Sequence, residues 1–224
     1  MCTIVGEEEV SGERDFKKRV LVDLARVILA QPNWEMSIRF SELLVLSAPS
    51  FFEALWGSSR FVIARRCFLR KRNLFSYQHA LFVEEEGRIA GMALGCSFDE
   101  KHRERLLTGL LMARYLLLSR EWKRIPFLLH ISPLGEINQG EFYLSNLAVY
   151  PEFQRRGLGS MLLGELEIRA RGIGADYLLL DVEGENTGAF AFYRRLGYSL
   201  EGALPPVKLG SALFQFLRMK KCLK

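Results

Sequence analysis

The sequence predicts a mixed α/β domain with a central, strongly twisted sheet flanked by helices. Three observations support this class. Residues 141–163 read as strand, loop and helix, because an apolar, β-prone half is followed by a half with glycines and arginines that turns helical. Residues 175–182 form a short, nearly continuous apolar run, typical of a strand buried on both faces. The chain has 224 residues, 49% of them hydrophobic, which is enough for a substantial core.

Two strands around a helix form a right-handed crossover, and ligands in open α/β sheets tend to lie at the carboxyl ends of such strands. The loop after the first strand carries two arginines and Gly157 and Gly159. A helix N-terminus leaves N–H groups unpaired and carries a partial positive charge, so we expect residues 154–159 to hold a pyrophosphate. The alternative is an ordinary strand-to-helix turn whose glycines serve only geometry.

Charge and cysteine content narrow the function classes. The 31 basic residues exceed the 26 acidic ones only slightly, so the net charge of +5 is weak evidence for an anionic partner. The four cysteines are far apart, and the three histidines are scattered, so no disulfide framework or metal site is predicted. No apolar run is long enough to span a membrane, and the start of the chain is acidic and unlike a secretion signal. We therefore expect a cytoplasmic protein with free thiols, and no membrane or DNA partner.

The first part of the chain reads mainly as helices. Residues 1–35 are interpreted as an N-terminal extension with one helix, over residues 15–30, and residues 36–224 as a single domain. Residues 40–56 indicate one or two helices joined around Ala48-Pro49-Ser50, with Ser50 as the N-cap of the second. A further helix over residues 60–72 carries six basic side chains and no acidic one. It is either a patch for nucleic acid or, as we favour, the solvated face of a packed helix.

The middle of the chain predicts a β-hairpin over residues 79–95, with an acidic turn. Residues 98–122 read as one long helix, or two broken near Gly109, with an apolar density that predicts extensive coverage. Residues 126–131 are interpreted as a strand, and the whole of 98–140 as a helical insertion.

The last part of the chain carries the strand 142–149, the helix 158–171 and the strand 175–182. Asn186 is a good N-cap for a helix over 187–196, and Tyr193 lies on the same face of that helix. Two final strands are expected, over residues 198–201 and 212–219.

Two blocks of residues resemble the GCN5-related N-acetyltransferases (GNAT). The family's pyrophosphate signature, Q/R-x-x-G-x-G/A after Val-x-Pro, is matched by Val149-Tyr150-Pro151 and Gln154-Arg155-Arg156-Gly157-Leu158-Gly159. A second block, Asn-x-x-Ala-(x)3-Tyr-(x)3-Gly-Phe, is matched by Asn186, Ala189, Tyr193 and Gly197, with Tyr198 in place of the Phe. The match covers about residues 142–198, and residues 81–95 resemble the family's second and third strands.

The resemblance implies a GNAT fold with acetyl-CoA held where the fourth and fifth strands splay apart. It implies that backbone amides of the loop hold the pyrophosphate, that the fourth strand pairs with the pantetheine arm, and that an N–H near Leu147 faces the developing oxyanion. The implied cofactor-binding residues are Leu147, Ala148, Val149, Gln154, Arg155, Arg156, Gly157, Leu158, Gly159, Ser160, Asn186 and Tyr193.

Two side chains are candidates for proton transfer. Tyr193 is the candidate general acid, since a phenol stays protonated at neutral pH; the alternative is a half-buried tyrosine packed on the sheet. Asp181 is the candidate general base, because desolvation near the end of an apolar strand can raise the pKa of a carboxyl. The rivals are Glu141, Tyr143 or a water held by Asn146 or Ser145, and the alternative role for Asp181 is a cap or salt bridge.

The sequence thus predicts an acetyl-CoA-dependent N-acetyltransferase that acts on a primary amine by direct attack in a ternary complex. The acceptor, a small molecule or a protein, is left open, and a homodimer is possible. One alternative is a non-catalytic acyl-CoA-binding module of the same fold. Another is an RNA- or ribosome-associated protein that uses the basic helix 60–72.

Overall fold

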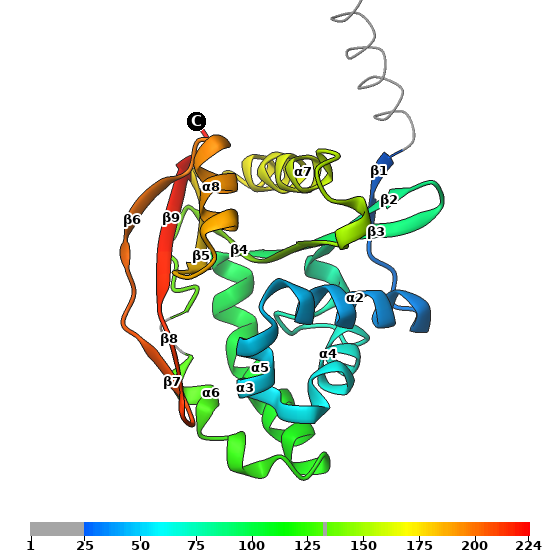
Figure 1. Cartoon of the computed structure of the whole chain (residues 1–224), viewed down its shortest axis with the longest axis vertical. Helices are drawn as coiled ribbons and strands as arrows, with labels where there is room; N and C mark the ends of the chain where they lie inside the picture. Colours follow the sequence, from blue (N-terminus) through cyan, green and yellow to red (C-terminus); the bar gives the residue numbers. More distant parts are fainter. Residues whose placement is uncertain (1–24, 132–133) are drawn as a thin grey trace, which may run out of the picture.

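A seven-stranded mixed sheet organises the part of the chain that the computed structural model describes, residues 25–131 and 134–224 (Figure 1). The strand order is β1-β2-β3-β4-β5-β9-β6. β4 and β5 pair in parallel, and the other neighbours pair antiparallel. A second, two-stranded sheet joins β7 and β8. The strands are β1 (Ala25–Leu29), β2 (Ala80–Glu85), β3 (Arg88–Ser97), β4 (Glu141–Val149), β5 (Tyr177–Glu183), β6 (Ser199–Ala203), β7 (Val207–Leu209), β8 (Ala212–Phe214) and β9 (Phe216–Cys222).

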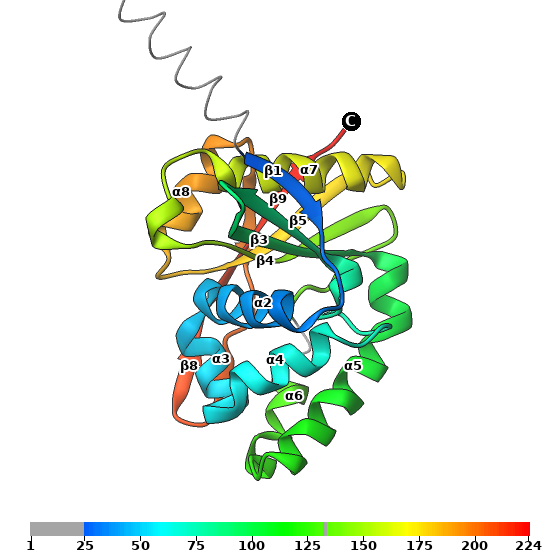
Figure 2. The same cartoon turned by 90° about the vertical axis from the view of Figure 1, so that its right-hand side faces the viewer.

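Helices cover both faces of the large sheet. Figures 1 and 2 show α7 on one face and α2, α4 and α5 on the other. Strands between them bury alternate residues on opposite sides: Phe82 and Met92 belong to the core under α2 to α5, whereas Leu81 and Val83 belong to the core under α7. The helices are α2 (Trp34–Ser47), α3 (Pro49–Trp56), α4 (Arg60–Phe68), α5 (Phe98–Leu118), α6 (Phe127–His130), α7 (Leu158–Gly172) and α8 (Thr187–Arg195).

The two parallel strands separate halfway along their length. β4 pairs with β5 from Glu141↔Tyr177 to Leu144↔Leu180, and beyond that point the pairing stops although both strands continue. The register between β3 and β4 shifts at the same level, between Leu94 and Gly95, and Ser145 is the extra residue. Because a β-bulge bends its strand, β4 turns away from β5 here. The splay expected from the sequence therefore exists between residues 145–149 and 181–183.

The predicted helix over residues 15–30 is wrong for its described part. Residues 25–29 form β1, which pairs antiparallel with β2 from Ala25↔Glu85 to Leu29↔Leu81. An apolar stretch this short fits both helical and strand spacing, and pairing with the edge of β2 favours the strand. The remainder of the predicted helix lies outside the described residues.

Two helices meet at Ala48, in agreement with one of the two predicted arrangements. Pro49 starts α3, since a helix tolerates proline where its N–H would be unpaired anyway. The prediction that Ser50 caps this helix is wrong, because Ala48 holds the N-cap position and contributes no side-chain hydrogen bond. α2 has a true cap, in which Asn33 Oδ1 accepts from the backbone N of Met36 at 2.8 Å.

The long helix α5 passes through Gly109 without a break, so the alternative of two helices is wrong. Its start is fixed by a capping box between Ser97 and Glu100. The expected coverage is also wrong, because the side chains of Leu106 and Leu110 are 71% and 60% exposed. Figure 2 shows the reason: α5 extends well beyond the sheet, so only part of it meets other elements.

A short helix replaces the strand predicted for residues 126–131. α6 begins after Pro126, whose backbone already has helical angles, and it packs against β7. A short apolar run has no period that distinguishes a strand from a buried turn of helix. The helical insertion over residues 98–140 is therefore built from α5, α6 and the turns between them.

The basic segment forms α4, which is shorter than the predicted 60–72 and buries Ile63 and Phe68. Several of its arginines pack against the fold itself. Arg65 lies over the ring of Trp34 at 5.5 Å, and Arg70, just after the helix, donates to the hydroxyl of Tyr115 at 2.8 Å. These contacts agree with the interpretation of a packed helix with a solvated face.

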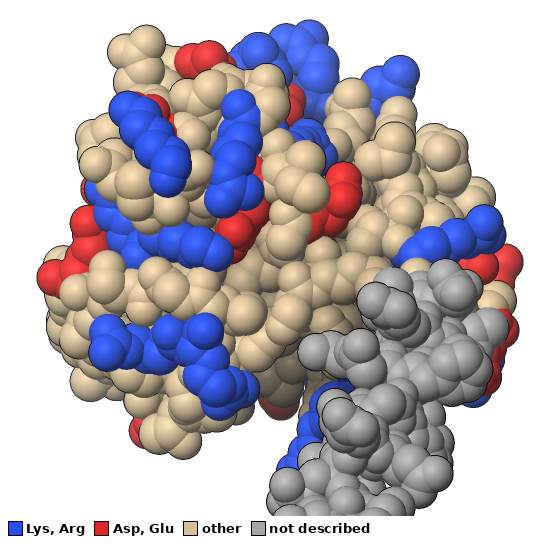
Figure 3. Space-filling model, turned by 90° about the horizontal axis from the view of Figure 1, so that it is seen from above, with Lys and Arg blue, Asp and Glu red and all other residues tan. Residues whose placement is uncertain are grey.

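Charges of both signs share the surface. Figure 3 shows the face that carries α7, where basic side chains stand in separate groups and acidic ones lie among them. Just below this surface Glu167 of α7 is buried, and its carboxylate binds Lys221 at 2.8 Å and lies 3.7 Å from Arg171. The excess positive charge is thus partly neutralised in local ion pairs.

The single strand predicted over residues 212–219 is wrong, because the chain is divided there into β8 and β9, which belong to different sheets. The other remaining elements are confirmed within a few residues. β2 and β3 form the expected hairpin, whose turn residues Glu86 and Gly87 both have positive φ, as such tight turns require. α7 and α8 begin at Leu158 and Thr187, as predicted. Asn186 caps α8, because its Oδ1 accepts from the N of Ala189 at 3.0 Å.

Candidate active site

The loop that leads into α7 has the geometry of an anion-binding site. Arg155 and Gly157 have φ of 62° and 85°, so the chain turns twice through the left-handed region before the helix. Gly157 is the N-cap of α7, and no side chain caps this helix end. The first amides of α7 therefore face outward without a side-chain acceptor, which favours a bound anion. A Cβ at position 157 would meet open space, so lack of room does not require a glycine there. The positive φ does, since residues with a side chain rarely adopt it.

The two arginines of this loop differ in their surroundings. Arg156 Nη1 binds the carboxylate of Glu85 at 3.0 Å, and its Nη2 donates to the carbonyl of Glu152 at 2.9 Å. The Glu85 side chain is only 2% exposed, so Arg156 compensates a buried charge and ties the loop to β2. Arg155 is exposed. Arg155 is therefore better placed than Arg156 to add positive charge beside a phosphate.

A large cavity of about 1140 Å³ opens at the splay of β4 and β5. Of the residues predicted for the site, Leu147, Asp181, Asn186 and Tyr193 line it. Ala148, Val149 and the loop residues Gln154–Ser160 do not line it, although the loop follows directly on β4. The rest of the wall comes from the end of α2, α3, α5, α6 and the start of β9. The structure thus brings the predicted catalytic pair together with elements that the resemblance does not cover.

Tyr193 occupies a buried position at this cavity. Its residue is 8% exposed, and its ring lies edge-on to the rings of Phe192 and Tyr198, at 5.2 and 5.7 Å between centroids. Burial raises the pKa of its hydroxyl well above the ordinary value for tyrosine. The hydroxyl is therefore protonated at neutral pH, as a proton donor must be.

Asp181 is held by a network of donors. Arg218 Nε binds its Oδ1 at 2.8 Å and Arg218 Nη2 binds its Oδ2 at 3.0 Å, while the N of Gly135 and the hydroxyl of Tyr143 also donate to Oδ2, at 2.7 and 3.1 Å. The hydrogen bond to Asp181 raises the pKa of Arg218. Two charge-assisted bonds in a forked geometry hold the Asp181 carboxylate in a fixed orientation against Arg218. Asp181 is thus occupied by a structural salt bridge, the alternative noted for it from the sequence.

Glu183 is a titratable group that the sequence interpretation missed. It lies at the end of β5, two residues after Asp181, and lines the same cavity. Its Oε1 is buried and has no hydrogen-bond partner among the described residues. Burial, and then the charge of Glu185, raise the pKa of Glu183 above the ordinary 4.5. The strand predicted over residues 175–182 ends just before this residue, and only its position two residues after Asp181, on the same face of the strand, could have indicated it.

The other groups considered as a base are engaged elsewhere. Glu141 binds Lys220 Nζ at 2.9 Å and does not line the cavity. Tyr143 donates to Asp181. Ser145 and Asn146 do line the cavity, where Ser145 donates to Asn146 and Asn146 donates to Ser47. The hydrogen-bonded side chains of Ser145, Asn146 and Ser47 could hold a water, but none of the three carries a carboxylate.

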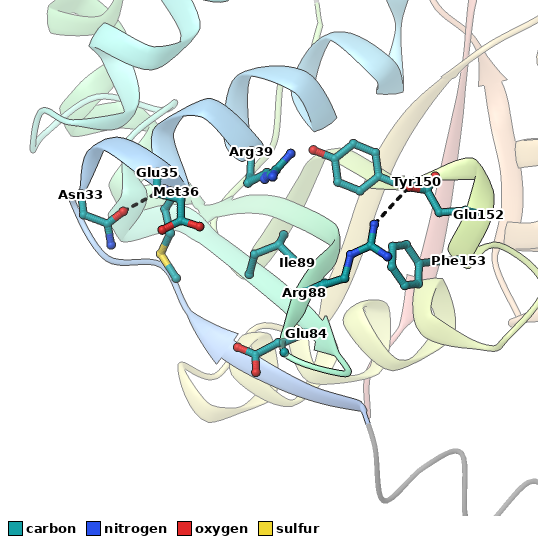
Figure 4. A pocket seen from close by; sticks show the side chains of 11 residues that line it. Asn33, Glu35, Met36, Arg39, Glu84, Arg88, Ile89, Tyr150, Glu152 and Phe153 are labelled. Atoms are coloured by element: carbon teal, nitrogen blue, oxygen red, sulfur yellow. Dashed lines mark hydrogen bonds and ion pairs between the residues drawn. The ribbon is translucent and has the colours of Figure 1, made fainter.

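A second, smaller hollow of about 330 Å³ lies between α2 and the β2–β3 turn, and Tyr150 forms part of its wall. Figure 4 shows that charged side chains such as Arg39, Glu84 and Arg88 surround it. These charges are largely paired: Arg88 lies 3.8 Å from Glu152, for example. No group of three or more metal-ligating side chains is found here or elsewhere in residues 25–131 and 134–224.

Solved structures with the same architecture identify the class of fold. An N-acetyltransferase from Staphylococcus aureus Mu50 aligns with a TM-score of 0.65 at 17% identity, over 88% of this chain and all of that one. A structure described as an acetyltransferase aligns with a TM-score of 0.60 at 18% identity, over 89% of this chain and all of that one. The protein therefore has an acetyltransferase fold.

The sequence then identifies the family. A family model described as "Acetyltransferase (GNAT) family" matches residues 47–198, more than half of the chain. The chain belongs to this family of N-acetyltransferases, as the two motifs predict.

Two curated relatives match over a shorter stretch. The [Ribosomal protein bS18]-alanine N-acetyltransferase of Salmonella typhimurium is 48% identical over 61 residues, which are 26% of this chain. The N-alpha-acetyltransferase RimI of Mycobacterium tuberculosis is 40% identical over 72 residues, 32% of this chain. The match spans only 40% and 44% of the length of these relatives.

In the described part of the chain, no helix is long and apolar enough to cross a membrane.

Proposed function

We propose that this protein transfers the acetyl group of acetyl-CoA to a primary amine, by direct attack of the amine in a ternary complex. One observation carries the proposal: a single cavity at the splay of β4 and β5 is lined by a protonated phenol, Tyr193, by a partly desolvated carboxyl, Glu183, and by Leu147, where β4 no longer pairs with β5. Acyl transfer to an ammonium needs a proton acceptor, a proton donor and a hydrogen bond to the carbonyl oxygen. The cavity offers all three.

The chain's own residues fit coenzyme A. The uncapped N-terminus of α7, with Gly157–Ser160 and Gln154 at its entrance, suits a pyrophosphate, and Arg155 adds positive charge. Ala148 and Val149 continue β4 past the point where β5 leaves it, so an extended pantetheine arm can pair with them like an added strand. Arg156, bound to Glu85, holds this loop in place.

Bound acetyl-CoA would supply the thioester. Glu183 takes the proton of the acceptor's ammonium, so that the neutral amine can form the new N–C bond while the C–S bond breaks. The N–H of Leu147 hydrogen-bonds the carbonyl oxygen as negative charge develops on it. Tyr193 gives its proton to the departing sulfur, and its oxygen regains a proton when the nitrogen loses its second proton as the amide forms. Asn186 caps α8 and so fixes the helix that carries Tyr193, and the Asp181–Arg218 pair joins β5 to β9 beside the site.

The acceptor amine is a small molecule or a protein. The curated relatives include an enzyme named for acetylating an alanine of a ribosomal protein, which makes a protein N-terminus one candidate. The acceptor side of the cavity is built by α3, α5 and α6, and the contacts of those helices decide between the candidates.

Acetyl-CoA binding and thiol release test the proposal directly. We expect calorimetry to detect acetyl-CoA binding, and free-thiol release from acetyl-CoA to accelerate when suitable primary amines are added. Binding without amine-dependent release would favour the non-catalytic acyl-CoA-binding module, and absence of binding would reject both.

A negative charge introduced at the start of α7 tests the proposed pyrophosphate-binding site. Ser160 is exposed in the first turn of α7. Ser160→Asp is expected to raise the KM for acetyl-CoA about tenfold or more, because a carboxylate repels the pyrophosphate. Its melting temperature should not fall, since a negative charge at a helix N-terminus stabilises the helix.

Ser160→Asn is the matched control, because it has nearly the same shape without the charge. It should keep the KM of the parent protein within about twofold. Equal effects of Asp and Asn, or a KM for Ser160→Asp that is independent of salt, would contradict a pyrophosphate at this helix end.

A further inference from the structure

The cavity has two chemically different ends. The end at β5 and α8 carries the polar groups assigned above, Glu183, Asn186 and Tyr193. The end between α3, α5 and α6 is apolar, and its walls include Phe51, Phe52, Leu55, Phe75, Met112 and Leu128. Of the strand residues expected to hold the pantetheine arm, Leu147 lines the cavity, and it lies on β4, the neighbour of β5, which places the donor at the polar end. The donor therefore leaves the apolar end available for the other substrate.

The rim of the apolar end is also hydrophobic. Leu106 and Leu110 of α5 and Leu129 of α6 line the cavity and are 71%, 60% and 78% exposed. Large apolar side chains gathered at the mouth of a cavity are typical of a site that receives an apolar ligand. A ligand with an apolar body would remove these walls from contact with water, which is favourable in proportion to the area covered.

The charges around the cavity favour an ammonium at its polar end. His102, Arg105 and Glu136 line the cavity but are exposed to solvent. Lys101 also lines the cavity, but its ammonium donates to the carbonyls of Leu134 and Gly135 and lies 4.9 Å from the centre of the Tyr143 ring. Asp181 is neutralised by Arg218. Glu183 is thus the lining carboxylate with a buried oxygen that lacks a partner among the residues described. An ammonium is its natural complement.

Resting on the proposed function, we propose that the acceptor is a primary amine with an extended apolar body, such as an alkylamine or arylalkylamine. Its ammonium binds Glu183, and its body lies between α3, α5 and α6. A polar acceptor, such as a peptide N-terminus followed by charged residues, would leave those apolar walls wet. An acyl chain of the donor is the competing occupant, and the experiment separates the two.

A series of linear amines from propylamine to octylamine tests the proposal, with acetyl-CoA as donor and thiol release as the readout. kcat/KM is expected to rise about three- to fourfold for each added methylene that enters the apolar end, until the cavity is filled. In the same assay the acyl chain of the donor is lengthened from acetyl to hexanoyl, with propylamine as acceptor. No comparable rise is expected there.

Gly109→Leu is designed to fill the apolar end. Gly109 lies in the middle of α5, lines the cavity, and a Cβ there meets nothing within 4 Å. The variant should fold, because leucine favours a helix more than glycine does. The ratio of kcat/KM between octylamine and propylamine should fall about tenfold or more. Gly164→Leu is the matched control: Gly164 lies in the middle of α7, has the same open space and does not line the cavity, so the ratio should stay unchanged.

The outcomes separate this proposal from the proposed function. If short amines are acetylated but kcat/KM does not rise with chain length, the apolar acceptor is rejected and the acetyltransferase stands. A dependence on acyl length that Gly109→Leu abolishes would assign the apolar end to the donor instead. If no amine releases thiol, calorimetric titration with octylamine still decides: binding weakened by Gly109→Leu but not by Gly164→Leu supports the apolar site, and absence of binding overturns it.

Discussion

Replacing Tyr193 with phenylalanine is expected to lower kcat about 10³-fold while leaving the affinity for acetyl-CoA within about twofold. The hydroxyl is the proposed source of the proton for the departing sulfur, and loss of a positioned acid typically costs 10²- to 10⁴-fold. The ring keeps its contacts with Phe192 and Tyr198, so the helix should stay in place. Thiol release measures kcat, and calorimetry measures the affinity.

Tyr198→Phe is the matched control for this prediction. Tyr198 is buried close to Tyr193, but its hydroxyl donates to Glu167 at 3.0 Å, away from the cavity. Losing that buried hydrogen bond should lower the free energy of unfolding by about 1–2 kcal/mol and leave kcat nearly unchanged. If Tyr193→Phe kept more than a tenth of the parent kcat, the role of Tyr193 as general acid would be rejected.

Glu183→Gln is expected to lower kcat/KM for the amine about 10²-fold or more, because glutamine has no basic oxygen to accept the ammonium proton. The parent protein should lose activity as the pH falls through the pKa of Glu183, which burial raises above 4.5. The variant should lack that acidic limb. A pH profile of kcat/KM from about pH 5 to 9 measures both effects.

Glu183→Gln is expected to lower activity but not the stability of the fold. Because the pKa of Glu183 is higher in the folded protein than in the unfolded one, ionisation of this side chain opposes folding. The stability it contributes is present below 4.5 and is lost as the pH rises through the raised pKa. Glu183→Gln should therefore melt at the same or a higher temperature than the parent at pH 7, with no advantage below pH 4.5. Differential scanning calorimetry at several pH values tests the sign.

Two neighbouring carboxylates provide controls. Glu185 is exposed, and its charge helps to raise the pKa of Glu183, so Glu185→Gln should move the acidic limb to lower pH without abolishing it. Asp181→Asn should mainly destabilise the fold, since it leaves Arg218 without its carboxylate. The opposite pattern, with the acidic limb lost in Asp181→Asn and kept in Glu183→Gln, would make Asp181 the base, as the sequence predicts.

Errors in the secondary-structure prediction fall where long-range contacts decide the outcome. Residues 25–29 have apolar spacing that fits a helix, yet they pair with β2, which lies more than fifty residues further along the chain. Residues 126–131 have no hydrophobic period that favours helix or strand. In the structure, residues 127–130 form a turn of helix that packs against β7. The exposed leucines of α5 have a similar cause, because a sequence shows how apolar a helix is but not how far it extends beyond its neighbours.

The sequence by itself determined the local structure of the proposed donor side. The strand β4, the loop with Arg155 and Gly157, and α8 with its Asn186 cap are all set by local propensity, positive φ and capping within residues 141–198. Such features depend on near neighbours in the chain, so their patterns can be read directly. The same features sufficed to indicate the family.

Only the tertiary structure decided which carboxylate is free and what the acceptor side is made of. Asp181 and Glu183 look alike in the sequence, two residues apart on one strand. Arg218 on β9 pairs with the first, whereas the second keeps a buried oxygen that has no partner within residues 25–131 and 134–224. The apolar end of the cavity joins α3, α5 and α6, which are distant in the chain. Burial and ion pairing arise from packing between distant segments, and no local pattern encodes them.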